Sequence, residues 1–596
     1  MNVHATRSLF EPNPATRPLP VWAAAVPPLA YYAALFLLPP LPKTVARPLR
    51  RLATLVRFGL AALSAYTFAV LPLRYYYPGS AVLTYQLGLV GWYGAGRVID
   101  VFFLSYPRVP SRIVISSTSD AAGQKGKGTG VSHPYPAGPN ETWKLEPHPR
   151  GLFTFERAWW ALDLLISMRG VGWDFASADV RHDSHPWQPP SSAQLRRALV
   201  KLLPVLLGCI FTMHTLHPAH TEALNPSITD LSTPARVAFV AATGISLYTL
   251  FDFGYTLSSA VALPVMADVA VQQAQRRLRK RSRKAGLAAK PGRRDRIRQV
   301  MADATPQDTE TETEAEGDDA DDTAVGAAAG GGQHKPPSLL QSSPQTHEQL
   351  SLRNVDFFPL LNPAGLTQAT TVRRFWSFAW HRLFGRFFGV YGILPFTYAA
   401  YLVEDVVQGK LWDAERVRAR REVWPSYHAD PMRSLQRGRA DWAKVLGAFT
   451  ASGIIHGVSE RAALGGRVAV PPTNVWLPKD HARGMGHELR AGMAAQSGVW
   501  GVLARLSPMR LAPPVSGGGE FSFFVLNGVA VIVEGAVARY VTQRRKRRNG
   551  GETYAMWYDR PVGIAWTLTV LLYTGQLFVE GWIRSGISKE LGLIVD

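Results

Sequence analysis

The sixteen residues from Arg373 to Phe388, RRFWSFAWHRLFGRFF, place two tryptophans and a histidine directly before an apolar run that continues to Val403. A second histidine, His456, lies in a later apolar run, SGIIHGV. Burying an imidazole in hydrocarbon is costly, so a histidine at membrane depth is by default a functional-site hypothesis. This stretch therefore predicts both a helical membrane fold and a site within it.

The composition supports the membrane assignment. Of the 596 residues, 47% are hydrophobic and 18% are charged, and the apolar residues are gathered into runs. Because a span needs about 20 residues and several runs are shorter, we expect an all-α, polytopic bundle of about seven to ten transmembrane helices. The first run is expected to be a retained helix, since no signal-peptide cleavage pattern precedes it. The nearly uncharged runs are 21–39, 58–73, 75–96, 202–216, 237–266, 387–403, 445–458, 521–537 and 561–579.

The net charge of +21 does not indicate nucleic-acid binding, because the basic residues cluster beside the predicted spans. Such clusters mark cytosolic loops and contact lipid headgroups. An outward amino terminus and five crossings would bring the first two clusters to the same side. The three basic clusters lie within 43–51, 276–284 and 544–548.

Two polar stretches divide the chain. Residues 111–150 include a segment rich in Ser, Gly and Pro, and residues 272–350 pass from a basic block to an acidic one and then to Ala and Gly. Neither can bury enough apolar surface to fold, so both are expected to be disordered cytosolic linkers. The predicted regions are transmembrane helices over 1–110, the linker 111–150, an amphipathic segment and spans over 151–271, the loop 272–350, and a C-terminal catalytic region over 351–596.

Cysteine and histidine usage argue against a thiol or metal centre. The single cysteine, Cys209, lies in an apolar run and excludes an intrachain disulfide. His214, His217 and His220 have a suggestive spacing, but Pro218 interrupts the helix and no carboxylate accompanies them. We therefore expect no metal site and no bound cofactor.

The sequence PheTrpSerPheAlaTrpHis, followed by SerGlyIleIleHisGly, resembles the wax-synthase branch of the membrane-bound O-acyltransferases, in particular its fungal members. The segment ArgGlyValGlyTrpAspPhe, from Arg169 to Phe175, is similar to an Arg-Gly-x-Gly-Trp element of those proteins. The resemblance is strongest over about Pro359 to Gly457, and we take 359–457 as the predicted catalytic core. It does not cover the two linkers.

The resemblance implies transfer of an acyl group, acetyl being one candidate, from acyl-CoA to a hydroxyl group of a hydrophobic acceptor. His456 matches the family's catalytic histidine and would remove the proton of the alcohol, a task for which an imidazole is suited near neutral pH. His381 would orient the donor or stabilise the oxyanion. The expected partners are acyl-CoA, a hydrophobic alcohol such as a secondary metabolite or long-chain alcohol, and membrane lipids, with the endoplasmic reticulum as the expected location.

Several residues carry two interpretations. Trp376 and Trp380, four residues apart, would share a helical face that either lines the reaction chamber or packs at the membrane interface. Basic side chains beside them would grip the phosphates of coenzyme A or extend to lipid headgroups. Asn527 and Glu534 would share a face, where Glu534 would pair with a histidine or arginine. The basic residues are Arg373, Arg374, Arg382 and Arg386, and the remaining supporting candidates are Arg169 and Trp173.

Two further interpretations complete the expectations. Arg97 and Asp100, three residues apart, are most simply a neutralising pair. The alternative function is a transporter or a non-catalytic membrane scaffold, in which Asp252, Glu534 and the histidines would form a proton or substrate path. The absence of an evident repeat between the two halves weighs against a transporter.

Overall fold

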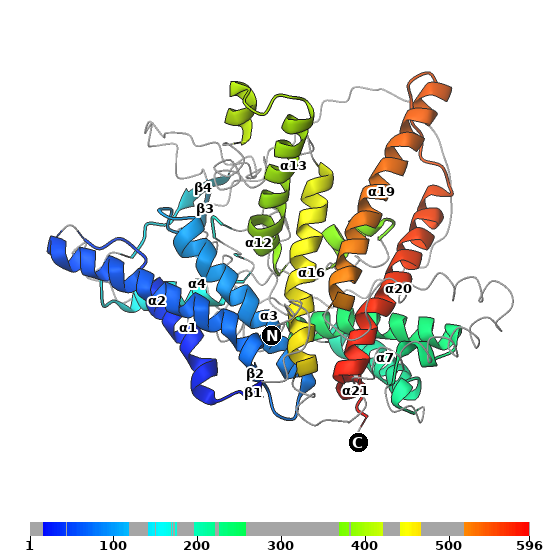
Figure 1. Cartoon of the computed structure of the whole chain (residues 1–596), viewed down its shortest axis with the longest axis horizontal. Coiled ribbons are helices and arrows are strands. Elements are labelled where there is room, and N and C mark those ends of the chain that lie inside the picture. The colour runs from blue at the N-terminus through cyan, green and yellow to red at the C-terminus, as the bar shows by residue number, and fades with distance from the viewer. Residues whose placement is uncertain are drawn as a thin grey trace, which may run out of the picture.

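The computed structural model describes most of the helical body (Figure 1). The described residues are 16–42, 44–117, 141–149, 151–168, 170, 173–175, 196–220, 226–257, 369–380, 383–420, 441–465 and 518–594. The predicted loop at 272–350 lies outside them, as do His381, Arg382 and Arg169.

Three helices form the N-terminal part of the bundle. The helix α1 (Val21–Phe36) packs on α2 (Arg47–Arg74), and α2 packs on α3 (Ala81–Ile99). Ser80 caps α3 by accepting a hydrogen bond from the backbone of Leu83, and the π-helical turn η1 (Asp100–Leu104) extends α3. The short strands β1 (Arg17–Pro18) and β2 (Tyr75–Tyr76) pair in parallel.

A hairpin and several shorter helices form the middle of the chain. Strands β3 (Ile113–Ser117) and β4 (Glu141–Leu145) pair antiparallel, with Ile115 opposite Trp143. The expected linker at 111–150 is therefore ordered at both ends, where β-branched and aromatic residues favour strands. The next elements are α4 (Phe155–Ile166), η3 (Ala198–Leu202), α7 (Leu203–Thr215), η4 (Pro218–His220), η5 (Ile228–Asp230) and a helix over Thr233–Leu257.

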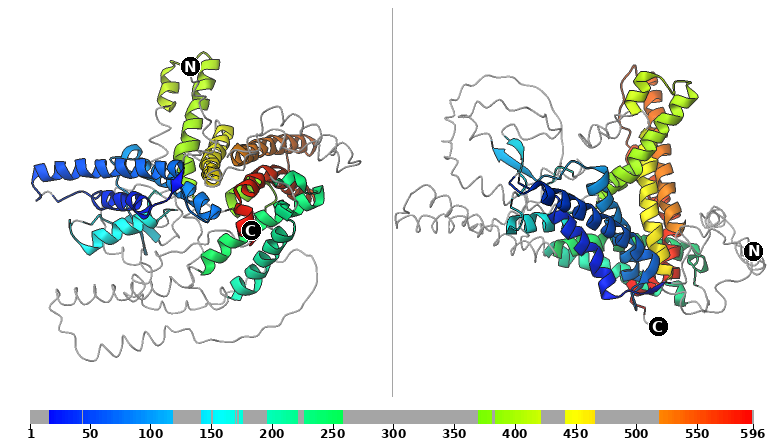
Figure 2. Two further views of the ribbon diagram at one scale, coloured as in Figure 1. Left: turned by 60° about the horizontal axis from the view of Figure 1, so that its bottom comes forward. Right: turned by 60° about the vertical axis from the view of Figure 1, so that its left-hand side comes forward.

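The C-terminal part begins with short, irregular elements and ends in three long helices. In chain order its elements are α11 (Val372–Arg374), η6 (Phe375–Ala379), α12 (Gly385–Phe388), η7 (Gly389–Ile393), α13 (Leu394–Val407), α16 (Asp441–Gly465), α19 (Gly518–Arg548), α20 (Asp559–Ser585) and α21 (Ile587–Leu591). The helix α16 lies between α3 and α19, and α20 packs on α19 (Figure 2). This position makes α16 the link between the two parts.

Seven helices of the described residues are long and apolar enough to cross a membrane, so the chain is a mostly helical, multi-pass membrane protein. The first predicted run forms α1, which has 16 residues and is shorter than a full span. The run at 445–458 lies inside α16, whose ends carry charged residues such as Asp441 and Glu460. Each of the nine predicted runs contributes a helix within the described part of the chain.

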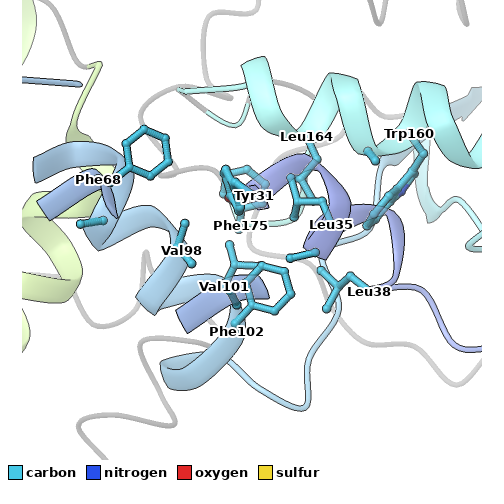
Figure 3. Close-up of a cluster of buried hydrophobic side chains, with 14 of the residues drawn as sticks. Tyr31, Leu35, Leu38, Phe68, Val98, Val101, Phe102, Trp160, Leu164 and Phe175 are labelled. Atoms are coloured by element: carbon cyan, nitrogen blue, oxygen red, sulfur yellow. The ribbon is translucent and has the colours of Figure 1, made fainter. Parts of the chain in front are cut away.

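Hydrophobic packing joins α1 to α4 in one cluster (Figure 3). Leu35 and Leu38, from α1 and the residues directly after it, and Leu164 of α4 are almost fully buried there. Trp173 and Phe175, from the predicted Arg-Gly-x-Gly-Trp element, belong to the same cluster. This element therefore packs against the N-terminal helices.

Two of the basic clusters lie at helix ends. The amino end of α2 carries Arg47, Arg50 and Arg51, and the carboxyl end of α19 carries Arg544 to Arg548. In Figure 1 the amino end of α2 lies at the left edge of the bundle and the carboxyl end of α19 at the upper right. The prediction that both clusters face the cytosol stays a prediction.

Candidate functional site

His456 lies on α16 and faces both α3 and α19. Its Nδ1 atom is 2.8 Å from the hydroxyl group of Tyr85 on α3, and its ring stacks on Phe524 of α19 with the ring centres 4.5 Å apart. The Tyr85 and Phe524 contacts restrict the imidazole in different directions, because one holds a ring atom and the other holds the ring plane. The orientation of His456 is thus set by two neighbouring helices.

Glu520 completes a hydrogen-bonded chain behind the histidine. Its Oε2 atom accepts a hydrogen bond from the Tyr85 hydroxyl group at 2.9 Å, and its Oε1 atom accepts one from Nε1 of Trp582 on α20 at 2.6 Å. Because the single hydroxyl proton of Tyr85 is directed to Glu520, the Tyr85 oxygen accepts the proton carried by Nδ1 of His456. That tautomer places the basic lone pair of His456 on Nε2.

The side chains of Glu520 and His456 differ in how much of their surface is exposed. The Glu520 side chain is 0% exposed, whereas the His456 side chain is 13% exposed. A buried carboxylate needs hydrogen bonds to compensate for lost hydration, and Glu520 receives one on each oxygen. The imidazole is therefore the more accessible member of a buried polar network.

A second carboxyl group, from Glu460, lies beside this network. One turn after His456 on α16, Glu460 accepts a hydrogen bond on Oε2 from the backbone N–H of Glu520 at 3.3 Å. Its Oε1 atom is buried and has no hydrogen-bond partner within the described ranges. A Cβ atom at Gly581 of α20 would lie only 1.3 Å from that oxygen, so α20 approaches α16 there without room for a side chain.

The predicted tryptophans form a layer next to the histidine. Trp376 lies in η6 and its ring contacts Phe524, with the ring centres 5.7 Å apart. Trp380 follows η6 in extended backbone, so the expectation that it shares a helical face with Trp376 is wrong. The π-helical turn ends before Trp380, yet the two rings still meet edge to face at 5.8 Å.

Asn527 and Glu534 hold this segment in place from α19. Nε1 of Trp376 donates a hydrogen bond to Oδ1 of Asn527 at 3.1 Å, and Asn527 itself is fully buried. The backbone N–H of Val372 donates to Oε2 of Glu534 at 2.8 Å. Asn527 and Glu534 thus both bind the segment that contains Val372 and Trp376. Glu534 binds it through a backbone N–H, whereas a histidine or arginine partner was expected.

The basic candidates separate into different environments. Arg373 and Arg374 are exposed on α11. Arg386 is buried and binds Asp100 through two hydrogen bonds, from Nε at 2.8 Å and from Nη2 at 2.9 Å. The expected ion pair between Arg97 and Asp100 is therefore replaced by one between two helices, which sequence spacing cannot reveal.

The Arg-Gly-x-Gly-Trp element contributes structure away from His456. Trp173 is fully buried and forms an isolated backbone bridge with Arg112. Gly170 has a φ angle of +71°, and a Cβ atom there would meet the Phe175 ring at 2.4 Å. Glycine is required at this position on both counts. This packing accounts for Trp173, which belongs to a different hydrophobic cluster from Phe524.

The remaining polar candidates have structural partners. His217 lies 2.9 Å from the hydroxyl group of Ser588, and His214 lies 3.0 Å from the carbonyl oxygen of Gly592. Asp252 accepts a hydrogen bond from Arg197 at 2.8 Å. These contacts join the end of α7 and the residues after it to the α21 region, and the residue before η3 to the helix Thr233–Leu257.

Sequence reasoning did not identify Tyr85, Glu520 or Trp582. A usable signal existed for Glu520, because a carboxylate directly precedes the apolar run at 521–537. Tyr85 is an ordinary aromatic residue in an apolar run and Trp582 follows another, so neither gave such a signal. No family model, curated protein or solved structure matches this chain, so the resemblance to the membrane-bound O-acyltransferases stays a prediction.

Proposed function

We propose that the chain is a membrane-embedded O-acyltransferase that moves an acyl group from acyl-CoA to a hydroxyl group of a hydrophobic acceptor. The observation that carries the proposal is the hydrogen-bonded chain from Trp582 through Glu520 and Tyr85 to His456. A histidine oriented through Tyr85 by a buried carboxyl group is an arrangement that favours general-base catalysis. The resemblance to the membrane-bound O-acyltransferases suggests acyl transfer as the reaction in which this base would act.

In the proposed reaction His456 takes the acceptor's proton on Nε2 as the alcohol oxygen attacks the thioester carbonyl carbon. The new C–O bond forms, the C–S bond then breaks, and coenzyme A leaves as a thiolate that can accept the proton from the imidazolium. Tyr85 and Glu520 stabilise the imidazolium while it exists, because the Tyr85 oxygen accepts from Nδ1 and the carboxylate accepts from Tyr85. His381 would supply the oxyanion contact, but it lies outside the described residues.

The apolar surroundings suit this chemistry. Water competes with the alcohol for the thioester, so a site lined by aromatic rings favours transfer over hydrolysis. Phe524, Trp376 and Phe523 pack together beside the imidazole with ring centres within 5.9 Å of one another. A helical bundle also admits a hydrophobic acceptor from the bilayer.

The test is the release of coenzyme A thiol by membranes that contain the protein. Acyl-CoA is supplied with and without a hydrophobic alcohol, and acetyl-CoA is compared with a long-chain donor. Alcohol-dependent thiol release that matches ester formation supports the proposal. Thiol release that is independent of every alcohol, or no release at all with acceptors from the sterol, long-chain and terpenoid classes, contradicts it.

A second candidate function is a proton-coupled carrier, favoured by one observation. Glu460 and Glu520 place two buried carboxyl groups together, and Oε1 of Glu460 has no hydrogen-bond partner among the described residues. Buried acidic groups of this kind can form proton relays within membranes. Reconstitution in vesicles with an internal pH dye would detect this function, and Glu460→Gln would abolish the pH change.

A further inference from the structure

A polar pocket lies at the carboxyl end of α3, and none of its lining residues belongs to the His456 cluster. It is lined by Arg97, Asp100, Ser105, Arg108, Asp174 and Arg386 together with Val101, Pro110 and Phe175. These residues come from α3, η1, α12, the segment that follows η1 and the Arg-Gly-x-Gly-Trp element. Three guanidinium groups and two carboxylates line it, so the pocket carries an excess of one positive charge.

The carboxylates are already engaged by two of the arginines. Asp100 binds Arg386, and Asp174 binds Arg108 at 3.0 Å and the backbone N–H of Ser111 at the same distance. Arg97 forms no ion pair with any carboxylate of the described chain, and its Nη2 atom is buried without a hydrogen-bond partner there. Its guanidinium instead lies over the Phe175 ring, 3.9 Å from the ring centre. Arg97 thus supplies the excess charge.

A buried guanidinium with an unused donor is costly unless an anion completes its hydrogen bonds. Arg97 is 6% exposed, whereas the Arg108 side chain at the pocket wall is 43% exposed. The pocket therefore runs from an accessible arginine to a buried one. We propose that this pocket binds a phosphate group, with Arg97 as its buried anchor and Arg108 as the positive charge at its accessible end.

Two sources could bring a phosphate here, the acyl-CoA donor and a lipid headgroup. The spacing along α3 favours acyl-CoA. Tyr85 and Arg97 lie twelve residues apart on the same helix, which corresponds to about 18 Å along its axis. An extended pantetheine arm spans a comparable length, so a thioester beside His456 would place the coenzyme A phosphates near Arg97. This assignment of the source rests on the proposed function, whereas the phosphate site itself does not.

Binding measurements on the purified full-length chain in nanodiscs test the site without acyl transfer. One arm uses coenzyme A as the probe in phosphatidylcholine nanodiscs, and the other uses nanodiscs containing phosphatidic acid, a lipid with a terminal phosphate. Arg97→Gln is expected to weaken binding of whichever probe occupies the pocket, coenzyme A or phosphatidic acid, by about tenfold or more. The reason is the loss of a charge-assisted hydrogen bond from the guanidinium to the phosphate. Arg97→Lys keeps the charge but loses the planar fork, so a smaller weakening is expected.

Arg57→Gln is the matched control. Arg57 is also a buried arginine that lies over an aromatic ring, Phe58 at 4.9 Å, but its side chain does not line the pocket. Its replacement should leave both dissociation constants unchanged. If Arg97→Gln does not accumulate, Arg97→Lys gives the decisive comparison.

The outcomes separate the site from the proposed function. Loss of coenzyme A binding in the Arg97 variants supports the site with acyl-CoA as the source, even if the wild type transfers no acyl group. Loss confined to phosphatidic acid supports the site with a lipid as the source. Wild-type affinity of the Arg97 variants for both probes overturns the site, whether or not the protein is an acyltransferase.

Discussion

The carboxylate of Glu520 stands 4.0 Å from Nδ1 of His456, beyond hydrogen-bonding distance, and the hydroxyl group of Tyr85 fills the gap between them. The carboxylate therefore acts on the imidazole through the intervening hydroxyl group of Tyr85, whose proton points either to Glu520 or to His456. Which nitrogen of His456 is basic depends on the direction of that proton.

His456→Ala should lower acyl transfer by about 10²–10⁴-fold, the range for loss of a general base. Turnover is measured in membranes and normalised to the amount of protein. His220→Ala is the control, since His220 is exposed and its hydrogen bond in the described structure is to the carbonyl oxygen of His214. Near-normal turnover of His456→Ala would remove the basis of the proposed mechanism.

Glu520→Gln should impair turnover more than Tyr85→Phe does. A side-chain amide at position 520 would present its nitrogen to the Tyr85 oxygen as a donor, so the hydroxyl proton would turn to Nδ1 of His456 and leave the proton on Nε2. That tautomer cannot act as the base, and a loss of about 10²–10⁴-fold in kcat is expected by analogy with other catalytic histidines. Tyr85→Phe only removes a hydrogen bond and should cost about tenfold.

The double variant distinguishes this explanation from simple disruption. Once Tyr85 is replaced by phenylalanine, the side chain at position 520 no longer sets the tautomer, so adding Glu520→Gln should cause little further loss. A double-mutant cycle on kcat would therefore show strong non-additivity. Additive losses would contradict control of the tautomer.

His381→Ala should also lower turnover, while His381→Asn should retain part of it. An amide can donate a hydrogen bond to an oxyanion although it cannot serve as a base. The two variants and the wild type are compared by kcat at saturating acyl-CoA. Equal losses in both variants would exclude a role limited to hydrogen bonding.

Gly581→Ala should destabilise the bundle, because the added methyl group would overlap Oε1 of Glu460 at the contact between α20 and α16. Gly535→Ala on α19 is the matched control, since a Cβ atom there meets nothing within 4 Å. Thermal unfolding in detergent should show a clear decrease in Tm for Gly581→Ala and no decrease for Gly535→Ala. Equal Tm values would show that α20 can shift without cost.

The loop at 272–350 should be cytosolic and dispensable. Its composition cannot form a core, and a basic block begins it directly after a predicted span. Protease added to sealed vesicles with the cytosolic side outward should cut there first, and a shortened loop should leave acyl transfer largely unchanged. Protection of the loop until detergent is added would show that the loop lies on the opposite side of the membrane.

The helices were predictable because hydrocarbon imposes long apolar runs on any span. The runs at 521–537 and 561–579 correspond to α19 and α20, and His456 was singled out because it is polar within such a run. The hairpin of β3 and β4 was missed, since each strand has only five residues, too few for a clear periodic pattern. Partners such as Tyr85 were also missed, because contacts between helices depend on their packing and Tyr85 precedes His456 by 371 positions.

The cluster around His456 has a consequence for synthesis of the protein. Tyr85, His456 and Glu520 come from helices that are made at different times, and Trp582 on α20 is the last member to emerge from the ribosome. The network that orients the proposed base is complete only after α20 has inserted beside α19. A nascent chain that lacks α20 would thus orient His456 less firmly, and separately expressed halves would regain full activity only when mixed in one membrane.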